Sequence, residues 1–152
     1  MTENSLPIID WPVFSRARSQ LGASFVRILG YFVEDGMKAV DSIENAMRAH
    51  DAAAMVIPAC TLKTESRQFG GEQLGQLAED IEDHARHCVE MHLAPDDYIE
   101  QVVRLRPLLE EMLSEIQAET NPLMQRRPGL GRHVAQARKL LAGAFLLLCN
   151  RQ

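Results

Sequence analysis

Residues 59–71 read A-C-T-L-K-T-E-S-R-Q-F-G-G, and they divide into two faces that decide the fold. On an α-helix, residues three and four positions apart share a face. One face of this helix holds a thiol, a hydroxyl, two cations and a glycine: Cys60, Thr64, Lys63, Arg67 and Gly71. The opposite face holds small and apolar side chains: Ala59, Leu62, Ser66 and Phe69. This division predicts a helix that packs into a bundle core and turns its polar, cationic face outward.

Boundary signals flank this helix on both sides. Asp51 is suited to cap its start, and Gly70 and Gly71 are suited to end it. Pro58 lies inside the helix, where it removes a backbone hydrogen bond. We therefore expect a kink just before Cys60.

Apolar residues also recur at helical spacing in the rest of the chain, and no alternating strand pattern is present. A short helix is expected over about residues 10–20, with Asp10 or Trp11 near its cap and Pro12 in its first turn. A long helix from Gly22 carries one apolar stripe: Phe25, Leu29, Phe32, Gly36, Val40, Ile43 and Met47. The helix after residue 71 carries another: Leu74, Leu77, Ile81, Ala85 and Cys88. A last helix, kinked at Pro107, carries a third: Tyr98, Val102, Leu105, Leu109, Met112 and Ile116. The pattern predicts an all-α fold, an antiparallel four-helix bundle with a short N-terminal helix across one end.

The composition is that of one ordinary globular domain. The chain has 152 residues, of which 46% are apolar and 24% are charged, so it can bury a core. A net charge of −5 does not suggest a nucleic-acid partner. Three cysteines at unrelated spacings fit reduced thiols. The start M-T-E-N-S does not read as a signal peptide, and no apolar run approaches the ~20 residues of a membrane span. We expect a cytoplasmic protein.

The C-terminal part is predicted to be separate from the bundle of residues 1–121. Prolines and glycines indicate a linker over residues 122–131. Residues 132–152 are expected to form an extra C-terminal helix, a tail that contains the run L-L-A-G-A-F-L-L-L-C. Because ten apolar residues are too few to span a bilayer, we expect the tail to dock on the bundle of a monomer or on a second copy in a dimer. Attachment to a membrane surface is the alternative, with Arg138 and Lys139 as a thin basic face.

The central helix resembles that of the histidine-containing phosphotransfer (HPt) family of two-component relays. The family helix reads His-x-Leu-Lys-Gly, followed by small residues, a glycine and a Leu-rich helix. The matching residues are Leu62, Lys63, Ser66, Phe69 and Gly70, with the similar continuation E-Q-L-G-Q-L-A-E-D-I-E over residues 72–82. Cys60 stands at the position of the phosphoacceptor histidine, and Thr64 stands where a glycine or serine is usual. The resemblance spans about residues 10–120 and implies a bundle of HPt type.

The resemblance implies a function in two-component phosphorelay signal transduction. A protein of this kind binds a response-regulator receiver domain, or a histidine kinase, through the helix face that carries the acceptor. A lysine on that face steadies the charge of the transferring phosphoryl group. The residues implied for partner or phosphoryl binding around Cys60 are Lys63, Thr64, Arg67, Gln68, Gly70 and Gly71. Because cysteine replaces the acceptor, we expect binding without histidine phosphotransfer, with no cofactor and no independent catalytic activity.

Two other functions stay open. The first is active phosphotransfer, in which Cys60 accepts phosphate itself or stands where an introduced substitution replaced a histidine. The second is a thiol redox or metal sensor, because His84, Cys88 and His92 lie at steps of four and imidazole with thiolate is a zinc ligand set. Cys88 falls on an apolar stripe and a fourth ligand is lacking, so we expect no metal site.

The remaining charged residues of the fourth helical segment are expected to lie in water. They form an acidic helix face: Glu79, Asp80, Glu82 and Asp83. His50 and His87 are likewise expected to be solvated polar residues.

Overall fold

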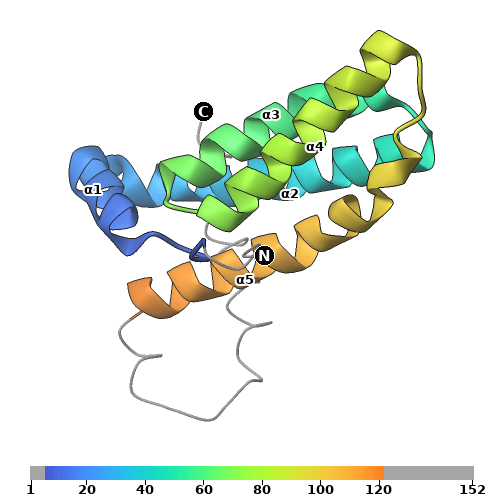
Figure 1. Ribbon diagram of the computed structural model, residues 1–152. Helices are drawn as coiled ribbons and strands as arrows, with labels where there is room; N and C mark the ends of the chain where they lie inside the picture. The colour runs from blue at the N-terminus through green and yellow to red at the C-terminus, as the bar shows by residue number, and fades with distance from the viewer. Residues whose placement is uncertain (1–5, 122–152) are drawn as a thin grey trace.

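The computed structural model describes residues 6–121, and every element in this part of the chain is helical (Figure 1). The predicted all-α class is confirmed, since no strand occurs among the described residues. The elements are α1 (Trp11–Leu21), η1 (Gly22–Ser24), α2 (Phe25–Arg48), α3 (Ala52–Gln68), α4 (Glu72–Met91), η2 (Asp96–Tyr98) and α5 (Ile99–Thr120), where η denotes a short 3₁₀ turn. The predicted linker over residues 122–131 and the C-terminal tail over residues 132–152 lie outside the described residues.

Helices α2 to α5 lie alongside one another, and the chain reverses direction at each connection between them (Figure 1). The most extensive interface joins α3 to α4, followed by the interface of α2 with α3. Helix α5 packs against α2 and α4 less extensively, and α1 lies across one end near α2 and α3 (Figure 1). Between residues 6 and 121, no helix combines the length and apolar character that a membrane crossing requires.

Two of the helices begin at the aspartates that the sequence indicates. The side chain of Asp10 accepts a hydrogen bond from the backbone N–H of Val13 at 3.2 Å. The side chain of Asp51 accepts one from the backbone N–H of Ala54 at 3.1 Å. Each contact satisfies a backbone donor that the first helical turn leaves without an intrahelical partner. The predicted starts of α1 and α3 are therefore confirmed.

The core is built from the predicted apolar stripes. All seven stripe residues of α2 are buried, as are the five of α4. On α5 the stripe is buried from Val102 to Ile116, whereas Tyr98 is only half-buried because it lies on η2 at the rim. Burying a large apolar side chain contributes about 1.5 to 3 kcal/mol relative to leaving it exposed. These stripes therefore hold α2 to α5 together.

The apolar face of α3 is also buried, as predicted. Its small and apolar residues Ala59, Leu62, Ser66 and Phe69 are almost without exposed surface. The Ser66 hydroxyl is satisfied inside the core, where it donates to the Leu62 carbonyl at 2.6 Å. The ring of Phe69 lies between Phe25 and Phe32, at centroid distances of 6.1 and 5.3 Å. Helix α3 remains continuous through Pro58, and α5 remains continuous through Pro107, so proline ends neither helix and the expected kinks stay predictions.

The turn between α3 and α4 depends on two glycines. Gly70 has φ +81°, and its carbonyl accepts a hydrogen bond from the backbone N–H of Asp10 at 2.7 Å. A Cβ at Gly70 would overlap the backbone carbonyl of Asp10. A Cβ at Gly71 would lie 2.5 Å from the Met112 sulfur. Gly70 therefore needs glycine, because of its left-handed backbone and the close approach of the start of α1, whereas a side chain at Gly71 would require the end of the Met112 side chain to move.

Alanine substitutions at Gly70 and Gly36 should have opposite effects on stability. Gly70→Ala combines a left-handed backbone with a clash against backbone, so we expect a loss of roughly 2 kcal/mol or more in the free energy of unfolding. At Gly36, inside α2, an added Cβ would make an ordinary contact of 3.5 Å with the Leu109 side chain. Gly36→Ala should therefore be neutral or stabilise by up to about 1 kcal/mol, through helix propensity. Urea unfolding of the two variants measures both values, and a stable Gly70→Ala protein would contradict the turn geometry.

Candidate functional site

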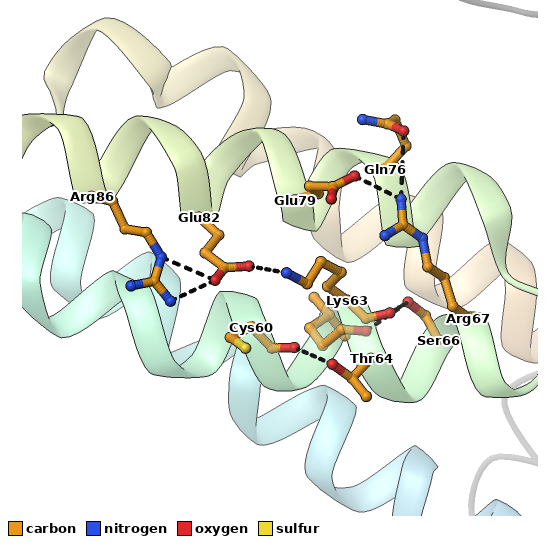
Figure 2. Close-up of polar contacts among 10 residues, drawn as sticks. Cys60, Lys63, Thr64, Ser66, Arg67, Gln76, Glu79, Glu82 and Arg86 are labelled. Carbon is orange, nitrogen blue, oxygen red and sulfur yellow. Dashed lines mark hydrogen bonds and ion pairs between the residues drawn. The ribbon is translucent and has the colours of Figure 1, made fainter.

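The residues predicted from the central motif lie where α3 meets α4 and solvent (Figure 2). We call this region the α3–α4 surface, formed by Cys60, Lys63, Thr64, Arg67 and Gln68 of α3 with Glu79, Glu82 and Arg86 of α4. Thr64 and Gln68 are exposed, and the other three α3 residues are half-buried. The structure therefore brings five of the predicted site residues to one side of the molecule.

The two predicted glycines do not share this exposure. Gly70 and Gly71 lie at the end of α3 but are buried. Gly70 lies against the backbone of Asp10, and Gly71 lies against the side chain of Met112. The structure thus gives both a role in packing and does not present them to a partner.

The α3 cation nearest to Cys60 is paired with a buried carboxylate. Lys63 Nζ lies 2.5 Å from Oε2 of Glu82, whose residue is only 3% exposed. On the other side, Arg86 donates to Glu82 Oε1 from Nε at 3.1 Å and from Nη2 at 2.7 Å (Figure 2). The expectation that Glu82 belongs to a solvated face is wrong, because α4 turns this residue toward α3.

The ionisation of Glu82 is decided by two opposing effects. Burial favours the neutral carboxyl, but the contacts with Lys63 and Arg86 favour the carboxylate more strongly, so the pKa of Glu82 lies below its ordinary value. The contact with Glu82 in turn raises the pKa of Lys63 and that of Arg86. Two cations and one carboxylate therefore meet here, with a net charge of +1.

Cys60 lies within electrostatic range of both cations. Its negative charge, as a thiolate, adds to the rise that Glu82 causes in the pKa of Lys63 and of Arg86. The neighbouring Thr64 hydroxyl does not donate to the thiol, because its Oγ1 donates its hydrogen bond to the backbone carbonyl of Cys60 at 3.0 Å (Figure 2). The half-buried thiol therefore has lysine and arginine as its charged neighbours.

A second pair of charges joins α3 to α4 one turn further on. Arg67 Nη2 donates to Glu79 Oε2 at 2.8 Å, and this contact lowers the pKa of Glu79. Gly75 leaves space for the arginine, because a Cβ there would lie 2.6 Å from Arg67 Cγ. The predicted cationic face is therefore largely balanced by carboxylates from α4.

His84, Cys88 and His92 lie in three different environments. His84 Nε2 lies 3.3 Å from Cys88 Sγ, and the His84 ring stacks on Tyr98 at 3.8 Å between centroids. Burial lowers the pKa of His84 and raises that of Cys88, which favours the neutral form of both. His92 is exposed at the end of α4, with a left-handed backbone. Within residues 6–121 no three His, Cys, Asp or Glu side chains are grouped as metal ligands would be.

The sequence interpretation missed the α4 partners of the cationic face, Glu79, Glu82 and Arg86. Only the spacing of Glu82 and Arg86, four residues apart, gave a local signal. His50 is exposed to solvent, as expected, and its Nδ1 lies 2.6 Å from Asp96 Oδ1. Comparisons with protein-family models, with curated proteins and with solved structures gave no match.

Replacement of Glu82 by glutamine should lower stability in a pH-dependent way. Glu82→Gln keeps the side-chain volume but removes the charge that Lys63 and Arg86 contact, so we expect a loss of about 1 to 3 kcal/mol at pH 7. Because folding lowers the pKa of Glu82, its contribution is fully present above the unfolded-state pKa of about 4.3 and is lost as the pH falls through the lower folded-state value. The difference between the two proteins should therefore shrink below about pH 4.

Urea unfolding at pH 7, 5 and 3.5 measures this difference. Asp83→Asn is the matched control, because Asp83 is exposed on the next residue of α4. We expect it to change stability by less than about 0.5 kcal/mol. Equal effects of Glu82→Gln and Asp83→Asn at pH 7 would show that the buried carboxylate does not hold α3 to α4.

Proposed function

We propose that this protein is an HPt-like binding protein of two-component signalling, which docks a response-regulator receiver domain or a histidine kinase through the α3–α4 surface. One observation carries the proposal. Cys60, at the position that resembles the phosphoacceptor, is half-buried on α3 next to the exposed residues Thr64 and Gln68, with Lys63 and Arg86 as its charged neighbours. This is a polar surface with a nucleophile position at one end of it.

The setting of the motif in the fold supports the same proposal. The motif lies on a long helix whose opposite face is core, and a two-glycine turn leads from it into the Leu-containing helix α4. Both features follow the order of the HPt pattern. The antiparallel run of α2 to α5 gives that helix two neighbours and leaves its outer side accessible to a partner (Figure 1).

Two features favour binding over phosphotransfer. The sulfur of Cys60 is closer to the backbone than the reactive nitrogen of a histidine, and a misplacement of ~1 Å can cost on the order of 100-fold in rate. Lys63 is held by Glu82, so its charge is already shared with a carboxylate when a phosphoryl group arrives. The surface is therefore suited to occupy a partner's acceptor site without passing phosphate on.

The second candidate is phosphotransfer to cysteine itself, favoured by the two cations near Cys60. In that reaction the thiolate sulfur attacks phosphorus and forms an S–P bond. The bond between phosphorus and the receiver's aspartyl oxygen breaks, and the aspartate leaves as a carboxylate. Lys63 and Arg86 would both stabilise the charge on the equatorial phosphoryl oxygens.

Transfer of labelled phosphate separates the two candidates. A panel of receiver domains, phosphorylated with labelled acetyl phosphate, is incubated with the wild-type protein, Cys60→His and Cys60→Ala. We expect label on Cys60→His alone, at a rate at least about 100-fold above that of the wild type, because an imidazole reaches the phosphoryl group that the thiol does not. Label is followed on the protein band over time.

Val26→His is the matched control, since it places a histidine at an exposed position of α2. It should stay unlabelled, so that label on Cys60→His reports the docking surface and not exposed histidine in general. Label on the wild type but not on Cys60→Ala would make cysteine the acceptor and overturn the binding-only function. Absence of label on every form, with every receiver domain, would contradict receiver docking at this surface.

A further inference from the structure

The charge of the chain is divided unevenly along its length. Residues 1–121 contain all 21 acidic residues and ten of the 16 basic ones, which gives a net charge of −11. Residues 122–152 contain no acidic residue and six basic ones: Arg126, Arg127, Arg132, Arg138, Lys139 and Arg151. A segment of charge +6 is therefore joined covalently to a body of charge −11. Opposite charges of this size attract at the short range that the covalent link imposes.

Helix α5, from which this segment leaves, is itself acidic. It carries five glutamates, Glu100, Glu110, Glu111, Glu115 and Glu119, against two basic residues, Arg104 and Arg106. Four of the five glutamates lie in its second half, next to the point where residue 122 begins. The most acidic part of the helix is therefore the part that the basic residues meet first.

The same helix presents two large apolar side chains to solvent. Ile99 is 54% exposed and Val103 is 66% exposed. Ile99, Val103, Arg106 and Glu110 recur at steps of three and four, so they share one face of α5. Arg106 donates to Asp41 and Glu44 of α2, which sets this face beside α2. We call it the α2–α5 face.

The length of the remaining chain fits this face. The ten residues 122–131 extend over at most about 33 Å, and α5 measures about 31 Å from Ile99 to Thr120. The eighteen residues 132–149 would span about 26 Å at the helical rise of 1.5 Å per residue. Of the four glutamates in the second half of α5, Glu110 shares the face of Ile99 and Val103, and the other three are turned to other sides of the helix. A segment antiparallel to α5 would therefore bring its basic residues within range of the acidic end of α5, and the run L-L-A-G-A-F-L-L-L-C beside Val103 and Ile99.

We propose that residues 140–149 of the same chain pack on the α2–α5 face over Ile99 and Val103, guided by attraction between the basic residues before them and the glutamates of α5. Docking in this way removes two apolar side chains of the bundle and a ten-residue apolar run from water together. It acts within one molecule, so it does not depend on protein concentration.

Hydrogen–deuterium exchange in the full chain tests this docking. We expect the backbone amides of residues 140–149 to be protected in the wild type and to exchange at least about tenfold faster in Val103→Glu, which places a charge where the apolar run packs. Ile57→Glu is the matched control, because Ile57 is 77% exposed on α3 and lies outside the α2–α5 face. Ile57→Glu should leave the protection unchanged.

Three results would overturn the proposal. One is equal exchange of residues 140–149 in the wild type and Val103→Glu. Another is a dimer by light scattering whose protection disappears on dilution, which would make a second copy the occupant. The third is protection that arises only after addition of phosphatidylserine vesicles, which would make an anionic membrane surface the occupant.

Discussion

Glu82 is a carboxylate withdrawn from water between α3 and α4, and it stays ionised because Lys63 and Arg86 approach it from two sides. A buried charge of this kind is tolerated only when its partners are held in place. Together with the contact between Arg67 and Glu79, it joins α3 to α4 by charged contacts at successive turns of the two helices. The same carboxylate holds Arg86 on the side of α4 that faces Cys60.

The balance of charge also determines what kind of surface the molecule presents. A helix read in isolation shows two free cations beside a nucleophile, which suggests strong attraction for phosphate. In the folded protein each of those cations contacts a carboxylate of α4, and the net charge around Cys60 is +1 (Figure 2). Under the proposed function, recognition of a partner would depend on the shape and polarity of the exposed residues Thr64 and Gln68 more than on a strong positive field. The proposal of binding without phosphotransfer rests on this balance of charge.

The sequence predicted the features of the fold that are local. Aspartate caps at Asp10 and Asp51 and the apolar stripes depend on spacing within one helix, so they could be recognised without tertiary information. The burial of Glu82 could not, because its main partner Lys63 lies on another helix, and an acidic run is usually a solvated face. The same holds for Gly70, whose neighbour Asp10 is 60 residues away. The site was thus predicted in its α3 half, and its α4 half required the packing of the two helices.

The central claim is that the outer side of α3 around Cys60 binds a receiver domain, and its location can be measured directly. Isotope-labelled protein is titrated with each member of a panel of isolated receiver domains, and changes in backbone amide chemical shifts are mapped on the structure. The account predicts that at least one receiver domain shifts the amides of Cys60, Thr64 and Gln68, while those around Val26 on α2 stay unchanged. Shift changes confined to other faces, or none with any receiver domain, would contradict it.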